Sequence, residues 1–519
     1  MADRVKKKRP RDERLPSPTA VSLPPHRLVL APMVGGSELA FRLLARRHGA
    51  QLCYTPMIKS EEFSNKGAGV ALLERHAEDA PLVAHFSGND PVKLLAAARR
   101  AERCAGVEAI DLNLGCPQRS AHSGHFGAFL LDPPDRPLVL RIVSTLSRAL
   151  RVPMFCKIRL LDELPDTLSF VQQLQDAGCA LLTVHGRYRG SPMRRRDGPA
   201  HLDQIKLVKE LLTIPVLTNG NVRDASELLA SLELTGADGV MSAEGALDDP
   251  AIFGRAIAAA HEERRQLKKQ IRSAKAMRAE KRSTGRKLSP EEKALLAGRK
   301  AARARLLQLN QLPTSDGGSD GESGGSSATI PSSPLDLAEQ YLELVRAHPP
   351  PGGRDALMTH TIFHLRRLAR ALLTKYELLP SLMACTSLEA AADVVCRCRA
   401  YESGELTFEP GAEAERKVLE DGEARAAANS ARRAEFVERM TAKARKDGKP
   451  DDFYLRVGRE PPTAADVAAA RRIGEKDSKA LTRWWRERFG QHCQGFHLDG
   501  ACPHLADARG CGFLHAEQS

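Results

Sequence analysis

The segment Asp111-Leu112-Asn113-Leu114-Gly115-Cys116-Pro117-Gln118 joins the end of an apolar run to a turn that a strand cannot cross. Pro117 has a fixed φ and no N–H to give to a ladder. The thiol of Cys116 is therefore expected at the carboxyl end of a strand, where parallel sheets and barrels keep their reactive groups. A thiol with a pKa of about 8.5 is mostly protonated near neutrality, which suits a proton donor as well as a nucleophile. A structural cysteine in a turn is the alternative.

Short β-type runs alternate with helical patterns from residue 27 to about 255. The runs are Leu28–Ala31, Leu52–Thr55, Leu82–Phe86, Ala109–Asn113, Met154–Ile158, Leu181–Val184, Val216–Thr218 and Gly239–Ser242. The helical patterns between them include Ser37–Arg47, Pro91–Cys104, Pro137–Leu150, Thr167–Asp176, His201–Leu211 and Ala225–Leu232. Eight such units predict an α/β fold, a (β/α)8 TIM barrel. A doubly wound open sheet is the alternative, but no early glycine-rich dinucleotide fingerprint is present.

Polar residues follow the predicted strands, and in a barrel they converge on one mouth. They are Pro32, Met33 and Val34, Thr55, His85, Asn113 and Cys116, Lys157 and Arg159, His185 and Arg187, Asn219, Gly220 and Asn221, and Ala243 and Glu244. Because loops after the last two barrel strands commonly cradle a phosphate, we expect a phosphorylated cofactor or substrate.

The order of these motifs resembles that of the tRNA-dihydrouridine synthases. The matching motifs are Leu30-Ala31-Pro32-Met33, Tyr54-Thr55-Pro56-Met57, Asp111–Gln118, Lys157-Ile158-Arg159, Leu182–Arg187, Asn219-Gly220-Asn221 and Met241–Gly245. The Cys-Pro-Gln and Ser-Ala-Glu-Gly motifs are most similar to those of the first eukaryotic subfamily, which modifies positions 16 and 17 of the tRNA D-loop. The resemblance implies reduction of the uridine C5=C6 bond with FMN and NADPH, with tRNA as the partner and a monomer as the favoured state.

The resemblance also implies a role for each matching residue. Cys116 falls on the family's general acid, and Asn113, Arg159 and Arg187 fall where the target uridine is gripped. The implied cofactor-binding residues are Pro32, Met33, Val34, His85, Lys157, His185, Asn219, Gly220, Asn221, Ala243 and Glu244. Two positions depart from the family: His85 replaces a usual Gln, and Ser123 stands where a basic residue is common. These departures motivate one rival, an RNA-binding scaffold with weakened catalysis; the other is an FMN barrel oxidoreductase acting on a small molecule.

The chain carries a formal charge of +13, from 78 Lys plus Arg against 65 Asp plus Glu, which favours a polyanionic partner. Its eleven Cys lack a paired framework, which indicates a reducing compartment. No apolar run is long enough for a membrane span. The basic cluster Lys6–Arg11 is typical of a nuclear-import signal, a phosphate-contacting arm or a solvated tail. We therefore expect a cytoplasmic or nuclear protein.

A basic stretch follows the barrel pattern. Residues 255–305 hold 17 Lys plus Arg and 5 Asp plus Glu in a helical pattern with few apolar residues. This stretch either runs along tRNA phosphates or is a solvated helix. A Gly/Ser-rich linker follows. The expected domains are a disordered basic N-terminus (1–26), the FMN-binding barrel (27–258), the basic insertion and linker (259–334), a helical tRNA-binding domain (335–405), a charged linker (406–480) and a zinc-finger-like tail (481–519).

Within the helical domain, His360, His364, Arg367 and Arg370 repeat at three- and four-residue spacing, which predicts a basic stripe facing tRNA rather than a metal pair. The tail contains Cys493, Cys502, Cys511 and His515 in the pattern Cys-x8-Cys-x8-Cys-x3-His, which resembles CCCH zinc fingers. His497 and His504 are alternative ligands, and a tail without metal is the alternative interpretation.

Overall fold

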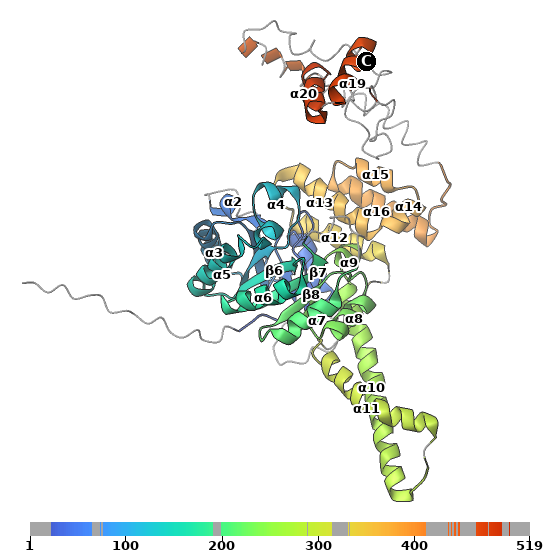
Figure 1. Cartoon of the computed structure of the whole chain (residues 1–519). Coiled ribbons are helices and arrows are strands. Elements are labelled where there is room, and N and C mark those ends of the chain that lie inside the picture. Colours follow the sequence, from blue (N-terminus) through green and yellow to red (C-terminus); the bar gives the residue numbers. More distant parts are fainter. Residues whose placement is uncertain are drawn as a thin grey trace, which may run out of the picture. The chain divides into compact units, whose positions relative to one another are not determined.

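The computed structural model describes residues 22–64, 73, 76–189, 199–287, 289–313, 331, 333–411, 463–475, 477–489 and 498, with scattered positions between 434 and 446. The chain divides into two compact units, Met1–Pro410 and Gly411–Ser519. The first contains the barrel, a helical hairpin and a helical domain (Figure 1). Within the described residues, no helix is long and apolar enough to cross a membrane.

The barrel forms as predicted. In the described residues, eight parallel strands close into a ring, because β1 pairs with both β2 and β9 while β2 also pairs with β4. The ring strands are β1 (Leu28–Leu30), β2 (Leu52–Tyr54), β4 (Leu82–Ser87), β5 (Ala109–Leu114), β6 (Met154–Leu160), β7 (Leu181–Tyr188), β8 (Val216–Asn219) and β9 (Gly239–Ser242). The two-residue strand β3 (Ile58–Lys59) pairs only with the carboxyl end of β4.

Alternation along each strand separates two apolar cores. One core fills the barrel interior and consists of Val29, Ala31, Leu52, Tyr54, Val83, Ala109, Phe155, Leu181, Leu217 and Met241. The other lies between the strands and the surrounding helices. Since side chains two residues apart share a face, the interior row continues past the apolar core into polar residues toward the carboxyl ends. On β5 this row runs from Ala109 through Asp111 to Asn113.

Helices cover the outside of the ring (Figure 1). They are α1 (Leu39–Arg47), α3 (Pro91–Ala105), α5 (Arg136–Ala149), α6 (Leu164–Asp176), α7 (Leu202–Leu211) and α8 (Ala225–Thr235). Shorter helices are α2 (Ser60–Ser64), α4 (Arg119–Ser123), the 3-10 turn η2 (Gly127–Leu131) and α9 (Glu244–Asp248). Local signals set their ends: Asp90 caps α3 by accepting from the N–H groups of Val92 and Lys93, and Gly106 ends it in the left-handed conformation.

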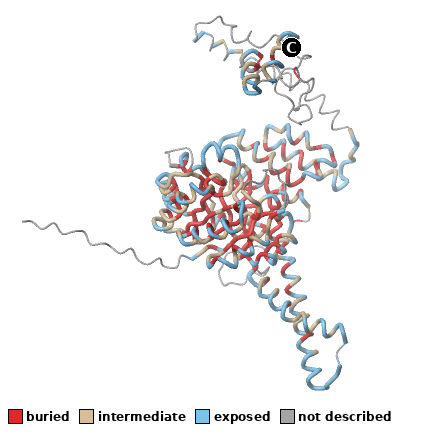
Figure 2. Tube along the Cα trace, viewed as in Figure 1, coloured by how far each residue is buried: buried red, intermediate tan, exposed pale blue. Residues whose placement is uncertain are grey.

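The predicted basic insertion is a helical hairpin that projects from the barrel (Figure 1). It consists of α10 (Ile252–Thr284) and α11 (Pro290–Leu309). Figure 2 shows the barrel interior buried and much of the hairpin surface exposed. The helical pattern predicted for residues 255–305 is confirmed, and beyond Ala260 the buried residues described in the two helices are Arg264, Ala274, Ala302 and Leu309.

The helical domain contains α12 (Pro334–Ala347), α13 (Gly353–Leu368), α14 (Arg370–Lys375), α15 (Leu379–Ala384) and α16 (Leu388–Ser403). Leu337, Tyr341, Leu344 and Val345 of α12 are all buried and form its apolar face. In the second unit, α19 (Ala464–Gly474) and α20 (Ser478–Phe489) pack around Trp485 and Phe489. The predicted domain boundary at residue 480 therefore falls inside α20.

Candidate active site

The strand register brings the predicted polar side chains together at the carboxyl ends. Asn113 lies beside Lys157, Arg159 beside His185, and His185 beside Asn219 on consecutive strands. Each of these residues lies two or four positions along its strand from a residue of the barrel-interior core, so its side chain is on the inward face. The sequence-predicted mouth is thus one contiguous surface on β5 to β8.

Cys116 is held by the residue three positions before it. The side-chain oxygen of Asn113 accepts hydrogen bonds from the N–H groups of Gly115 and Cys116, each at 3.0 Å. The N–H of Ala128 donates to the Cys116 carbonyl at 3.0 Å. Gly127 is required there: its φ is +67°, and a Cβ on it would lie 2.8 Å from that carbonyl oxygen. The backbone on both sides therefore fixes where the half-buried thiol lies.

Burial raises the pKa of the Cys116 thiol, although Arg159 and Lys157 act in the opposite direction. The thiol consequently stays protonated near neutrality, which fits a proton donor better than a thiolate nucleophile. Asn113 has a positioning role that its motif alone does not reveal, because its amide oxygen is used inside the turn. Its Nδ2 lies 3.0 Å from the sulfur of Met57.

Three cations line the mouth. Burial and the charge of Arg159 lower the pKa of Lys157 to about 8. Its Nζ donates to the Asn219 side-chain oxygen at 2.9 Å, and Asn219 donates in turn to the Met241 carbonyl. Arg159 donates to the carbonyls of Gly115 (3.0 Å) and Tyr188 (3.3 Å). These contacts fix the cations without neutralising them.

The third cation, Arg187, donates to the Asn221 side-chain oxygen at 3.3 Å. Within the described residues, none of Lys157, Arg159 and Arg187 forms an ion pair with a carboxylate. Burial and the three cations lower the pKa of His185 well below its ordinary value, so this imidazole is neutral. A mouth with three uncompensated cations and a neutral imidazole is suited to an anionic ligand.

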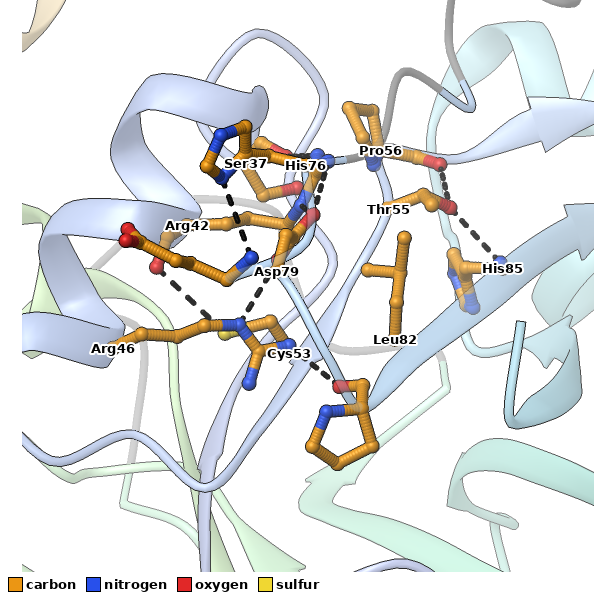
Figure 3. Close-up of polar contacts among 12 residues, drawn as sticks. Ser37, Arg42, Arg46, Cys53, Thr55, Pro56, His76, Asp79, Leu82 and His85 are labelled. Carbon is orange, nitrogen blue, oxygen red and sulfur yellow. Dashed lines mark hydrogen bonds and ion pairs between the residues drawn. The ribbon is translucent and has the colours of Figure 1, made fainter. Parts of the chain in front are cut away.

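His85, the departure on the third ring strand, forms a buried pair. Its Nδ1 lies 2.5 Å from Asp111 Oδ2, and both side chains are nearly inaccessible. Burial raises the pKa of Asp111, and the hydrogen bond with His85 opposes that effect. The His85 N–H donates to the hydroxyl of Thr55 (Figure 3). Only Nε2 of His85 therefore remains for a ligand, and Asp111 is a site residue that the sequence reasoning did not single out.

The loop after β1 is braced by a second buried group that sequence reasoning missed (Figure 3). Asp79 is fully buried between Arg42 (2.7 Å) and Arg46 (3.0 Å) of α1. Arg42 also donates to the Ser37 carbonyl at 2.7 Å, and the Ser37 hydroxyl bonds the backbone of Met33. This network fixes the loop that carries Pro32, Met33 and the exposed Val34. Nothing in the residues around Asp79 resembles a motif, so the sequence held no signal for it.

The loops after β8 and β9 lie as predicted at the same end. Gly220 has a φ of +111°, and Asn221 follows with +56°. Ala243 precedes α9, which begins at Glu244. The Glu244 carboxylate accepts from Arg367 of the helical domain at 2.8 Å. Its side chain is therefore engaged with α13, and a cofactor role would fall to the backbone at this position.

The predicted tRNA-facing stripe on α13 is wrong for two of its members. His364 is fully buried and lies 3.1 Å from Glu38 of the barrel, which also accepts from Tyr341 at 2.8 Å. Arg367 is likewise buried and bonds Glu244 and Asp248. These residues join the two domains because acidic partners from the barrel face them, and the spacing along α13 could not reveal those partners.

No group of three or more His, Cys, Asp or Glu suited to a metal occurs within the described ranges. His360 and His364 both lie near Glu38, at 3.8 and 3.1 Å, but they do not form such a group. The predicted zinc ligands Cys493, Cys502, Cys511 and His515 lie outside the described residues.

A family model described as dihydrouridine synthase matches residues 29–311, more than half of the chain. The chain belongs to the dihydrouridine synthase family. The chain is 45% identical over 232 residues to the Mus musculus tRNA-dihydrouridine(16/17) synthase [NAD(P)(+)]-like protein, covering 44% of this chain and 47% of the relative. It is 41% identical to the tRNA-dihydrouridine(16/17) synthase [NAD(P)(+)] of Saccharomyces cerevisiae, covering 43% and 53%.

A second subfamily is also similar. The Homo sapiens tRNA-dihydrouridine(20a/20b) synthase [NAD(P)+]-like protein is 39% identical over 229 residues, covering 43% of this chain and 70% of the relative. The chain spans about half the length of the first two relatives. The family match extends through the whole α10–α11 hairpin, whereas the helical domain lies beyond it.

Proposed function

We propose that this chain is a tRNA-dihydrouridine synthase that uses FMN and NADPH to reduce uridine in the D-loop, at position 16, position 17 or both. The observation that carries the proposal is the position of the Cys116 thiol, whose backbone Asn113 fixes beside Lys157 and Arg159 and whose pKa is raised by burial. Family membership supports the reaction, and the names of the mouse and yeast relatives support the position.

The residues at the mouth fit FMN. Three cations without carboxylate partners in the described chain favour an anionic ligand, and the positive φ angles of Gly220 and Asn221 let successive N–H groups turn toward a phosphate. The proposed binding residues are Pro32, Met33, Val34, His85, Lys157, His185, Asn219, Gly220, Asn221, Ala243 and the backbone of Glu244. FMN held by these residues would supply hydride-transfer chemistry toward C6 of the uracil ring, with NADPH as the source of the hydride.

The chain's own residues complete the reduction. The Cys116 Sγ–H donates its proton to C5 of uracil, and the thiolate is reprotonated from solvent; such a step is typically worth about 10²–10⁴-fold. Arg159 and Arg187 hold the flipped uridine and its phosphates, while Asn113 positions the thiol. Lys157 stabilises negative charge in the mouth, because its ammonium is buried and, among the residues that the structure describes, bonds an amide oxygen and no carboxylate. Extrusion of the base costs roughly a few kcal/mol, less from a loop than from a duplex.

The test maps dihydrouridine across tRNAs from cells that lack this protein, rescued with the wild type or with Cys116→Ala. We expect the D-loop signal to vanish and only the wild type to restore it. Full rescue by Cys116→Ala would remove Cys116 as the acid. Loss of dihydrouridine at 20a or 20b instead would correct the position, and no loss anywhere, without a compensating sister enzyme, would favour the RNA-binding scaffold.

We also propose a zinc site at Cys493, Cys502, Cys511 and His515. The support is the residue pattern alone, since thiolates and imidazole are the usual ligands of structural zinc. Metal analysis of the purified chain, with Cys502→Ser as the control, tests it. About one zinc per chain, lost in the variant, is the expected result.

A further inference from the structure

The α10–α11 hairpin is a rooted arm rather than a loose extension. The first turns of α10 pack into the apolar core between the strands and the surrounding helices, where Ile252, Phe253 and Ala256 are fully buried. At its base, Arg305 of α11 forms ion pairs with Glu263 of α10 (2.7 Å) and with Glu233 of α8 (3.1 Å). The 33 residues of α10 make a helix about 50 Å long. The arm therefore holds its side chains at set positions relative to the barrel.

At the far end of the arm, ion pairs join the end of α10 to the start of α11. Arg286 forms ion pairs with Glu280 (3.2 Å) and Glu292 (2.9 Å). Glu292 also completes a capping box with Ser289 at the start of α11. Four of the acidic residues near the arm are thus used at its base or its tip.

Between these two ends, the outer side of α10 carries a row of five cations, four of which form no ion pair within the described residues. We call Arg265, Lys268, Lys269, Arg272 and Lys275 the arm stripe; all five are exposed. Their three- and four-residue spacing places them on one face, away from the partly or fully buried Leu267 and Ala274. Within the described residues, the stripe's only ion pair joins Arg265 to Glu262 at 2.8 Å.

The stripe extends over about 15 Å of helix and is unfavourable in isolation, because like charges at these spacings repel. An anionic partner would remove that repulsion. A membrane surface is a poor match, since helices that bind one pair their basic face with large apolar side chains. The arm's exposed large apolar residue in the described chain is Leu307, which lies on the other helix. A regular row of phosphates matches the stripe better.

We propose that the arm stripe binds the phosphate backbone of the tRNA, at a place other than the nucleotides that enter the barrel mouth. The inference rests on the proposed function for its partner and extends it by assigning a second contact surface. Contacts of this kind are independent of sequence, so the arm would orient the tRNA without selecting the uridine.

The test compares the affinity for a full-length tRNA transcript at several KCl concentrations. The test variant changes the five stripe residues to Gln: Arg265→Gln, Lys268→Gln, Lys269→Gln, Arg272→Gln and Lys275→Gln. The control loses the same charge from the outside of the barrel: Arg99→Gln, Arg103→Gln, Arg141→Gln, Arg148→Gln and Arg151→Gln. A third variant exchanges Lys and Arg within the stripe and keeps its charge.

We expect the stripe variant to bind about tenfold more weakly at 150 mM salt, with a log–log salt slope reduced by about 2 to 3, since each lost phosphate contact lowers it by about 0.7–0.9. The control and the charge-conserving variant should keep the wild-type slope. Equal slopes for the stripe variant and the control, with unchanged melting temperatures, would overturn the inference. If the proposed function itself is wrong, the wild type will form no dihydrouridine whether or not it binds tRNA, which is a distinct outcome from a change in salt slope.

Discussion

Arg367 on α13 and Lys268 on α10 carry the same charge in opposite surroundings. Arg367 is buried against the barrel and meets Glu244 and Asp248, whereas Lys268 is exposed and belongs to the arm stripe. The first belongs to what we call the seam, the set formed by Glu38, His364, Arg367, Glu244 and Asp248 between the barrel and the helical domain. The difference indicates that Arg367 serves folding at the seam, whereas the exposed Lys268 has the surroundings that our proposal of phosphate binding on the arm requires.

The largest expected effect comes from Glu38, whose carboxylate is the centre of the seam. Burial alone would raise its pKa, but His364 and His360 lower the pKa of Glu38 to about 2. Glu38→Ala should cost about 3–5 kcal/mol of unfolding free energy, because it leaves buried polar partners without a carboxylate. Calorimetry is the suitable measurement, since both tryptophans lie in the other unit.

The exposed pair Lys59–Glu62 provides the control, and Glu62→Ala should cost less than about 0.5 kcal/mol. The lowered pKa of Glu38 also fixes how its contribution to stability changes with pH. The folded pKa of Glu38 is depressed, so its contribution is complete above its ordinary value of 4.5 and disappears as pH falls toward about 2. An equal loss of stability in both variants would contradict the role of the seam.

Arg367→Met should have the next largest effect. It removes charge-assisted hydrogen bonds to Glu244 and Asp248, and we expect a loss of about 1–2 kcal/mol because both acidic partners are half exposed. FMN affinity, followed by flavin fluorescence, should also fall, because Glu244 begins the helix after β9. Arg370→Met, on the exposed side of the same domain, should change neither quantity.

Lys157 lies between the two extremes, since it is buried like Arg367 yet has no carboxylate partner in the described chain. Its pKa of about 8 means that the ammonium is mostly lost by pH 9. We expect FMN to bind about tenfold more weakly at pH 9 than at pH 7, because one pH unit above the pKa leaves about a tenth of the charge. In Lys157→Met this pH dependence should vanish. A pH-dependent affinity that survives the substitution would assign it to another group.

The smallest change in stability is expected for substitutions on the arm, and we expect a slight gain where the other variants lose stability. Lys268→Gln together with Lys269→Gln should change stability by less than about 0.5 kcal/mol, with a slight gain, because like-charge neighbours are relieved. Melting temperature measures this. A loss comparable to that of Arg367→Met would mean that the stripe serves folding and not binding.

The sequence predicts the barrel and its mouth because both follow from local patterns. Alternation fixes which residues of β5 to β8 face inward, so Lys157, Arg159 and His185 can be assigned to the mouth before the register is known. The seam could not be predicted in this way. Glu38 and His364 are 326 residues apart, and helical spacing places His364 and Arg367 on one side of α13 without saying what that side faces.

The measurement that tests the account most directly separates the two half-reactions in the purified chain. Wild type, Cys116→Ala and Cys396→Ala are loaded with FMN, and NADPH oxidation and dihydrouridine formation on a tRNA transcript are followed separately. Cys396 is an exposed free thiol on α16 and serves as the matched control. We predict that all three proteins oxidise NADPH. Only Cys116→Ala should form dihydrouridine more slowly, by about 10²-fold or more. Equal dihydrouridine formation by Cys116→Ala and Cys396→Ala would contradict the assignment of the Cys116 thiol as the proton donor.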